Sequence, residues 1–302
     1  MKTIAELYQT HDGNVSDKWS SYFAFYERAF SPIRNNPVRL LEVGIQNGGS
    51  LEIWGKYFSN AQKLLGCDIN PNCRKIEHSD PRISVIIGDI KAPATLQQVF
   101  EQSPKFDVII DDGSHTSSDI IQAFCKLFSS LEHGGLYIIE DLHASYWKPW
   151  EGGLNLRTSS MAFLKKLADV INFEHWGLPQ SRLEYLKEFG VSPELTEALL
   201  GEINSIEFAN SVCLITKRPH AQNQLGKRRI TGLTEVVAQA RQADGMILTA
   251  PQQKDVSPAL SDSTSNQLVN LLNEKLASKD KLIAMLSQQV VDLQQLLEFK
   301  PE

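Results

Sequence analysis

The stretch RLLEVGIQNGGS (Arg39–Ser50) indicates how the chain folds. Its first five residues, 39–43, form a short apolar run typical of a buried strand, and they lead into a glycine-rich turn. The turn contains Gly44 and then Gly48 and Gly49, and these glycines allow the backbone to approach a ligand closely. In a doubly wound sheet, ligands bind at this place, beyond the carboxyl ends of the strands.

Short apolar runs alternate with helical stretches after this point, which is the pattern of βαβ units and a mostly parallel sheet. A closing antiparallel pair is expected to turn at Asn210. We therefore predict an α/β fold with a doubly wound sheet. Its strands are expected at 39–43, 63–67, 83–87, 107–110, 136–139, 205–208 and 212–216.

Composition changes along the chain and predicts four segments. Residues 1–37 form an N-terminal helical cap, in which the aromatic segment 22–30 is expected to pack on the core and not to act as a substrate lid. Residues 38–218 form the sheet domain, and 219–265, rich in Gln, Ser, Pro and charge, form a polar linker. Residues 266–300 repeat apolar side chains at 3-4 spacing, which predicts a coiled coil and a homo-oligomer.

Charge and hydropathy exclude several classes of partner. Thirty Lys and Arg residues against thirty-six Asp and Glu give a net charge of −6, without the basic stripe that nucleic-acid binding requires. No signal peptide and no membrane-spanning run is visible, so we expect a soluble cytoplasmic protein. The four cysteines form no C-x-x-C pair, which favours reduced, buried thiols over a zinc or disulfide framework.

Acidic residues follow each of the first three strands. Glu42 would repel a pyrophosphate, and the glycine spacing is not G-x-G-x-x-G, so a dinucleotide is disfavoured. Glu42 instead suits a cofactor that carries an ammonium and a sulfonium. Asp68 is placed to accept both hydroxyls of a ribose, and Asp89 could accept the amino group of an adenine. Each acidic residue alone could belong to an ordinary turn, but three in register indicate a cofactor pocket.

The sequences LEVG at 41–44, Cys67-Asp68 and Gly88-Asp89 resemble successive motifs of the class I S-adenosylmethionine methyltransferases. The resemblance implies a Rossmann-like sheet of seven strands that ends in a reversed hairpin, and S-adenosylmethionine as the cofactor. The residues expected to bind this cofactor are Glu42, Gly44, Asn47, Ser50, Asp68, Asp89 and Asp111.

Acidic side chains also end the fourth and fifth strands, in the sequences DDGSH (111–115) and EDLH (140–143). Both ends open at the edge where the cofactor pocket is expected, so Asp112, Glu140 and Asp141 should converge. Carboxylate oxygens in such a cluster favour Mg²⁺ or a similar ion. The alternative, that these carboxylates cap helices or pair with Lys and Arg, explains the two acidic pairs poorly.

The sequence DDGSH followed by IEDLHASYW is similar to the macrolide and rhamnosyl sugar O-methyltransferases, a group that includes the macrocin and mycinamicin enzymes. The cephalosporin-hydroxylase-like family is a more distant relative of that group. Carried over by motif, the resemblance makes Asp112, Glu140 and Asp141 the metal ligands. It makes His115 the general base.

The expected chemistry agrees with this assignment, because a sugar hydroxyl is too weak an acid to attack a methyl sulfonium unaided. A bound metal stabilises alkoxide character, and a histidine can take the proton. We therefore expect a magnesium-dependent O-methyltransferase that acts on a sugar hydroxyl of a natural-product glycoside or surface glycan, preferably a diol. His143 is a candidate for the acceptor pocket, and Tyr146 and Trp147 either stack on the sugar or pack the loop.

Two other interpretations stay open. The same fold and metal could serve a catechol or polyketide phenol, whose hydroxyl is more acidic and needs a base less. Alternatively, the coiled coil carries the function, and the domain binds a ligand without catalysis.

Overall fold

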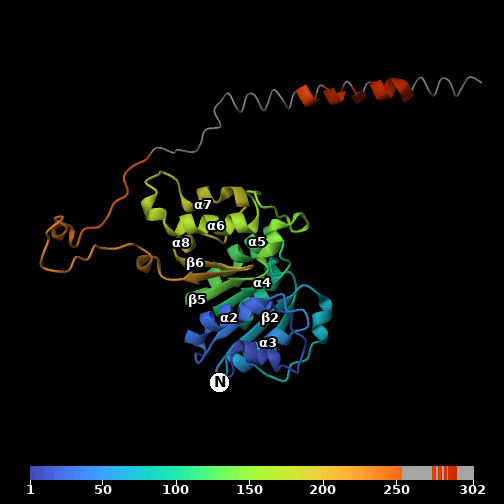
Figure 1. The fold of residues 1–302 in the computed structure, drawn as a ribbon. Coiled ribbons are helices and arrows are strands. Elements are labelled where there is room, and N and C mark those ends of the chain that lie inside the picture. The colour runs from blue at the N-terminus through green and yellow to red at the C-terminus, as the bar shows by residue number, and fades with distance from the viewer. Residues whose placement is uncertain (254–273, 277, 281, 284, 291–302) are drawn as a thin grey trace, which may run out of the picture. The chain divides into compact units, whose positions relative to one another are not determined.

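The computed structural model describes residues 1–253, 274–276, 278–280, 282–283 and 285–290. The chain divides into two units, residues 1–251 and 252–302, and the first contains the sheet. Helices cover both faces of that sheet (Figure 1). This arrangement confirms the predicted α/β class.

Seven strands form the sheet in the order β3-β2-β1-β4-β5-β7-β6. Neighbours among β1 to β5 run parallel, whereas β7 is antiparallel to β5 and β6 is antiparallel to β7. The Rossmann-like sheet with a reversed hairpin is therefore confirmed. The strands are β1 (Arg39–Val43), β2 (Lys63–Asp68), β3 (Ile83–Ile87), β4 (Phe106–Asp111), β5 (Leu131–Ile139), β6 (Ile203–Ala209) and β7 (Val212–Lys217).

The strand β5 begins five positions before the predicted run that starts at Leu136. Its first residue, Leu131, is buried and pairs with Phe106, but His133 and Gly134 after it are exposed. Because these polar residues interrupt the apolar run, the sequence pattern did not predict the start of the strand.

Two apolar clusters lie on opposite faces of the sheet, because successive side chains of each strand point to opposite sides. Leu40 belongs to one cluster with α1, α2 and α3, and Leu41 belongs to the other with α4 to α8. The α-helices are α1 (Ile4–Gln9), α2 (Ser20–Phe30), α3 (Gly49–Tyr57), α4 (Pro93–Gln102), α5 (Ser117–Leu127), α6 (Ser160–Ile171), α7 (Arg182–Tyr185) and α8 (Glu197–Leu200).

Short 3-10 helices complete the connections between these elements. They are η1 (Ser31–Ile33), η2 (Pro71–Lys75), η3 (Phe128–Ser130), η4 (Leu142–Tyr146), η5 (Lys148–Trp150), η6 (Phe173–His175), η7 (Lys187–Phe189), η8 (His220–Gln222) and η9 (Arg241–Ala243).

The aromatic helix α2 packs on the core. Tyr22, Phe25, Tyr26 and Phe30 are buried, and the Tyr26 and Phe30 rings lie 5.1 and 5.6 Å from the ring of Trp54. Burying each such ring stabilises the fold by about 1.5–3 kcal/mol. The helix thus fixes the N-terminal segment against the sheet.

Residues 218–253 are mostly exposed, and they contain two 3-10 turns and one isolated bridge between Lys227 and Ile247. The described residues between 274 and 290 are helical and exposed. Most of the predicted coiled coil at 266–300 lies outside the described residues, so it stays a prediction, as do the segment boundaries. Among the described helices, none is long and apolar enough to cross a membrane.

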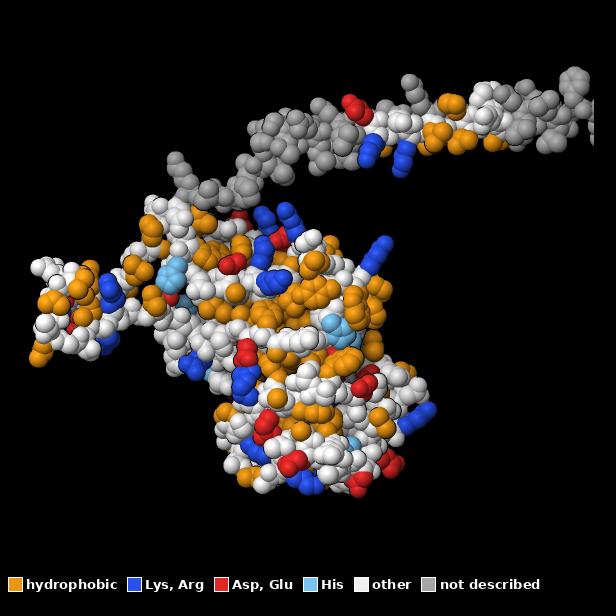
Figure 2. Space-filling view, viewed as in Figure 1, with side chains coloured by type: hydrophobic (Ala, Val, Ile, Leu, Met, Phe, Trp, Pro, Cys, Tyr) orange, Lys and Arg blue, Asp and Glu red, His pale blue; other side chains and the backbone are white. Residues whose placement is uncertain are grey.

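On the face of the first unit shown in Figure 2, basic and acidic side chains are interspersed. All four cysteines, Cys67, Cys73, Cys125 and Cys213, are buried and free of disulfide bonds, as their spacing predicted.

Candidate active site

A cavity of about 560 Å³ opens beyond the carboxyl ends of the parallel strands. This volume lies within the range of roughly 300–1,000 Å³ that small-molecule sites occupy. Most of the predicted site residues line the cavity. They are Gly44, Ser50, Asp68, Asp89, Asp111, Asp112, His115, Glu140 and Asp141.

The turn after β1 must contain glycine at position 44. Gly44 has a φ of +82°, and a Cβ atom there would lie 2.0 Å from the carbonyl oxygen of Asp112. Gly44 N donates to the Cys67 carbonyl at 2.8 Å, and Asp112 N donates to the Val43 carbonyl at 2.9 Å. The missing side chain therefore lets the ends of β1, β2 and β4 approach one another around the cavity.

Asp68 is the last residue of β2, and Asp89 follows β3. Both line the cavity, as do the acidic residues at the ends of β4 and β5. Asp68 Oδ2 accepts from the backbone N–H groups of Ile45 and Gln46, both at 3.0 Å. This carboxylate thus holds the glycine-rich turn and keeps lone pairs that face the cavity. Asp89 Oδ1 accepts from Lys91 N at 2.9 Å, and its side chain is 38% exposed.

Asp111 is buried at the end of β4. Its Oδ1 accepts from Gly113 N at 3.3 Å, whereas its Oδ2 has no partner within the described chain. Burial raises the pKa of this carboxyl to about 7. A buried polar atom that is unpaired and borders a cavity is a site where a ligand can supply the missing hydrogen bond.

Glu42 is fully buried and lies behind the cavity wall. Its carboxylate accepts from Ser50 Oγ at 2.7 Å and from Trp54 Nε1 at 3.2 Å, and the Lys18 ammonium lies 3.2 Å away. The ammonium that Glu42 meets in this structure therefore belongs to Lys18. Asn47 is exposed, does not line the cavity, and contacts only the neighbouring side chain of Gln46.

Lys18 is the residue of this site that sequence reasoning missed. Its Nζ lies 2.5 Å from Asp112 Oδ2 and 2.7 Å from Glu140 Oε1. Burial alone would lower the pKa of Lys18, but the carboxylates of Glu140, Asp112 and Glu42 outweigh burial and hold this pKa well above its ordinary value. Burial raises the pKa of Glu140 despite the ammonium, and the three carboxylates of Glu42, Asp112 and Glu140 share this one positive charge.

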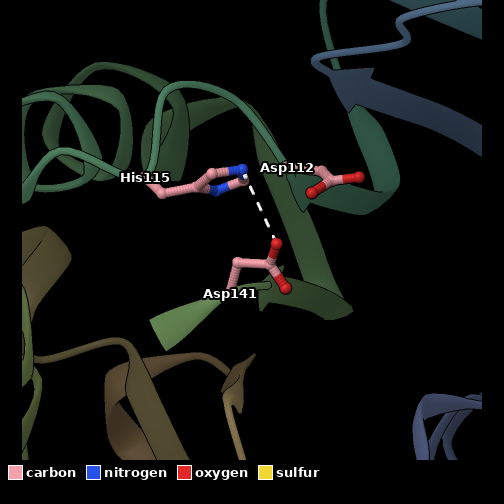
Figure 3. A group of neighbouring side chains, drawn as sticks. All are labelled: Asp112, His115 and Asp141. Carbon is pink, nitrogen blue, oxygen red and sulfur yellow. Dashed lines mark ion pairs between the residues drawn. The ribbon is translucent and has the colours of Figure 1, made fainter. Parts of the chain in front are cut away.

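Three side chains of the predicted metal and base set meet at the cavity edge (Figure 3). Asp112, His115 and Asp141 place one ligand atom each within 4.8 Å of one another. His115 Nε2 lies 3.7 Å from Asp141 Oδ2. His115 and Asp141 both have positive φ, 58° and 53°, which is uncommon for residues other than glycine and costs free energy. Glu140 is not a member of this group, and its Oε1 contacts the Lys18 ammonium and accepts from Tyr26 Oη.

Aromatic donors from the N-terminal segment reach the same carboxylates. Trp19 Nε1 and Tyr22 Oη each donate to Asp141 Oδ1 at 2.9 Å, and Tyr26 Oη donates to Glu140 Oε1. The signal available in the sequence was the spacing of four residues between the two tyrosines, which places them on one face of a helix. Their hydroxyls, however, were assigned no role.

The three candidate acceptor residues lie at the surface and do not line the cavity. The His143 ring lies between Trp19 and Trp147, with centroids 5.8 and 4.8 Å away, and its Nδ1 is 2.5 Å from Ser211 Oγ. Tyr146 is 39% exposed and Trp147 is 48% exposed. Trp19 lines the cavity, His143 contacts Trp19, and Trp147 contacts His143. The three rings therefore lead from the cavity to the exposed side chain of Trp147.

Comparison with known proteins identifies what the chain resembles. Residues 26–139 match the model of the FtsJ-like methyltransferase family. The chain is 33% identical over 216 residues to a rhamnosyl tetracenomycin-C 2'-O-methyltransferase of Streptomyces olivaceus, covering 68% of this chain and 53% of that protein. It is 35% identical over 164 residues to mycinamicin VI 2''-O-methyltransferase of Micromonospora griseorubida, covering 51% of this chain and 40% of that protein.

A solved structure has the same architecture. The MycE methyltransferase of mycinamycin biosynthesis, in complex with Mg, S-adenosylhomocysteine and mycinamycin VI, superposes with a TM-score of 0.59 at 26% identity, covering 72% of this chain and 54% of that one. The chain therefore spans about half the length of the relatives it matches. The resemblance to class I methyltransferases and to the macrolide sugar enzymes is confirmed.

Proposed function

We propose that this chain, a class I methyltransferase fold related to the sugar O-methyltransferases of macrolide and tetracenomycin glycosides, transfers a methyl group from S-adenosylmethionine to a sugar hydroxyl. The observation that carries the proposal is the meeting of Asp112, His115 and Asp141 at the edge of the cavity. Relatives at 33% and 35% identity are named for this reaction on glycosides.

The cavity fits the cofactor by the chemistry of its wall. Gly44 permits close backbone approach, and Asp68 retains acceptor capacity for ribose hydroxyls. We assign Asp89 to the adenine amino group, because it is the partly exposed carboxylate after β3. The buried and unpaired Oδ2 of Asp111 is a further acceptor. Glu42 and Ser50 then shape this wall from behind, through their mutual hydrogen bond.

The acidic cluster fits a divalent cation. Its carboxylates offer hard oxygen ligands, which suit Mg²⁺, and the three carboxylates of Glu42, Asp112 and Glu140 share the single ammonium of Lys18. Asp112, Glu140 and Asp141 would hold the ion. When bound, it would stabilise alkoxide character on an acceptor hydroxyl, and S-adenosylmethionine would supply an activated methyl group.

His115 is proposed as the general base. Its imidazole lies at the cavity edge and is one quarter exposed, so an acceptor hydroxyl can reach it. Asp141 Oδ2 lies 3.7 Å from His115 Nε2. We propose that this carboxylate orients the imidazole in addition to its role toward the cation.

The acceptor is proposed to lie against Trp19, His143 and Trp147. These rings extend from the cavity to the surface, and an aromatic face can stack on the apolar face of a sugar. Tyr146 stands beside them and is partly exposed. A glycoside that has two neighbouring hydroxyls could bind the cation through both oxygens, with the hydroxyl to be methylated also within reach of His115.

Methyl transfer from labelled S-adenosylmethionine, measured over a panel of deoxysugar glycosides and simple catechols, tests the proposal. Transfer to glycosides in the presence of Mg²⁺ is the expected result. Transfer to catechols alone would indicate that the acceptor is a phenol and not a sugar. No transfer to any acceptor, with cofactor still bound, would favour a binding domain without catalysis.

We also propose that the chain assembles as a homo-oligomer through residues 266–300 and works in the cytoplasm. The heptad spacing of the apolar residues supports assembly. The four buried cysteines without disulfide bonds suit a reducing compartment.

A further inference from the structure

Donors from the N-terminal segment bind one oxygen of each predicted metal ligand. The Lys18 ammonium contacts both Asp112 Oδ2 and Glu140 Oε1. Tyr26 Oη donates to the same Glu140 oxygen, and Trp19 Nε1 donates to Asp141 Oδ1. All of these donors lie between residues 18 and 26, within α2 or just before it.

The opposite oxygens of these carboxylates are left open. Within the described chain, Asp112 Oδ1, Glu140 Oε2 and Asp141 Oδ2 accept no hydrogen bond, although Asp141 Oδ2 faces His115 at 3.7 Å. All three carboxylates line the cavity. One oxygen of each group is thus fixed by the protein, and the other is available to a ligand.

Tyr22 anchors Asp141 from two sides. Its hydroxyl accepts from the Asp141 backbone N–H at 3.1 Å, and its one proton is shared between Asp141 Oδ1 at 2.9 Å and the carbonyl oxygen and Oγ of Ser211 at 2.9 and 3.0 Å. Asp141 has a φ of +53°, a conformation that surrounding contacts must maintain. The Tyr22 hydroxyl therefore sets both the backbone and the carboxylate of this residue.

Resting on the proposed function, we infer that Lys18, Trp19, Tyr22 and Tyr26 are positioning residues that form the outer shell of the cation site. Hydrogen bonds from such a shell orient the ligands of a metal and raise its affinity. Lys18, Trp19 and Tyr22 precede the part of the chain that matches the FtsJ-like family, which begins at residue 26. The N-terminal segment thus completes a site whose ligands lie on β4 and β5.

The test is Mn²⁺ binding to the full chain without cofactor, measured by calorimetry and by the electron paramagnetic resonance spectrum of the bound ion. Tyr22→Phe and Tyr26→Phe each remove one hydroxyl and preserve the buried ring. We expect each to weaken Mn²⁺ binding by about 10-fold or more and to alter the spectrum of the bound ion. Circular dichroism checks that each variant retains its fold.

Tyr57→Phe is the matched control, because the hydroxyl of this buried ring donates to Glu27 Oε1 at 3.1 Å and, among the described residues, to no carboxylate of the cluster. This variant should bind Mn²⁺ within about twofold of the unaltered chain. Equal affinity in Tyr22→Phe, Tyr26→Phe and the unaltered chain would overturn the inference. Absence of Mn²⁺ binding in the unaltered chain would overturn both the inference and the metal role, whereas bound Mn²⁺ without methyl transfer would overturn only the proposed reaction.

Discussion

His115 has two possible roles at the scale of the residue, base or metal ligand, and one substitution separates them. As the base, His115→Ala should lower kcat for sugar methylation by about 10²- to 10⁴-fold and leave the affinity for Mn²⁺ nearly unchanged. The comparison uses kcat from methyl transfer and Kd from calorimetry on the same preparation. His133→Ala is the control, since His133 is half-exposed and pairs only with Glu202.

Loss of Mn²⁺ affinity in His115→Ala would instead make His115 a ligand, as its place within 4.8 Å of Asp112 and Asp141 allows. A rate close to that of the unaltered chain would contradict the sugar acceptor, because a phenol ionises more easily and depends less on a base.

Lys18 is the second residue whose role can be isolated. Lys18→Met keeps the aliphatic chain but leaves the buried carboxylates of Glu42 and Glu140 without their cation. Removing one partner of a buried ion pair typically costs about 3–5 kcal/mol of unfolding free energy. We expect a loss of this size in urea denaturation with chelator present.

The control for Lys18→Met is Lys91→Met, measured for stability alone. Lys91 lines the same cavity, but its partners Asp119 and Asp89 are partly exposed, and such a pair contributes about 1 kcal/mol or less. Equal losses in the two variants would show that Lys18 does not neutralise the cluster.

At the scale of the element, the fold could be predicted from local patterns, whereas the outer shell of the site could not. The runs at 39–43 and 83–87 are short, apolar and bounded by turn residues, and the strands lie there. Lys18 reads in sequence as an ordinary solvated charge. It reaches Asp112, 94 positions away, because the N-terminal segment packs in the apolar cluster on the sheet face that includes Leu40 and Val108. Such a contact depends on tertiary packing, which no local spacing encodes.

The positions of the acidic residues at the strand ends could be predicted from the sequence only in part. Topology alone brings the ends of β4 and β5 together, so the meeting of Asp112 with Asp141 followed from sequence. The direction of the Glu42 side chain could not be predicted from the sequence. It depends on hydrogen bonds from Ser50 and Trp54, on the next helix, which hold the carboxylate behind the cavity wall.

The end of α3 supplies a prediction about pH. Arg82 donates to the carbonyls of Gly55 and Phe58 near the end of this helix and to the Asp80 carboxylate. The hydrogen bonds from the Arg82 side chain lower the pKa of Asp80 below its ordinary value of 3.8. A lowered pKa means that the folded state favours the ionised form. The stabilisation is therefore complete above the ordinary pKa and is lost as pH falls through the lower, folded pKa.

Asp80→Asn should reduce the unfolding free energy most near neutral pH, and the difference from the unaltered chain should shrink below about pH 4. Urea denaturation of both proteins from pH 3 to pH 7 measures this difference. A deficit that stays constant over the whole range would mean that ionised Asp80 contributes nothing to the helix end.

At the scale of the whole molecule, the tail is predicted to decide the state of assembly. The sheet domain lies within residues 1–251, and the heptad pattern lies beyond it. We expect the full chain to sediment as an oligomer and a chain shortened to residues 1–251 to sediment as a monomer, because apolar heptads associate in water. Equal assembly states for the two chains would contradict a role of the heptads.

The central claim is that a divalent cation at Asp112, Glu140 and Asp141 is needed for methyl transfer to a sugar hydroxyl. The most direct measurement is the rate of methyl transfer to a deoxysugar glycoside in excess chelator, followed by titration with Mg²⁺, in the unaltered chain and in Asp141→Asn. We predict that chelator abolishes transfer, that Mg²⁺ restores it in the unaltered chain, and that Asp141→Asn requires far more Mg²⁺. Undiminished transfer in chelator would contradict the claim.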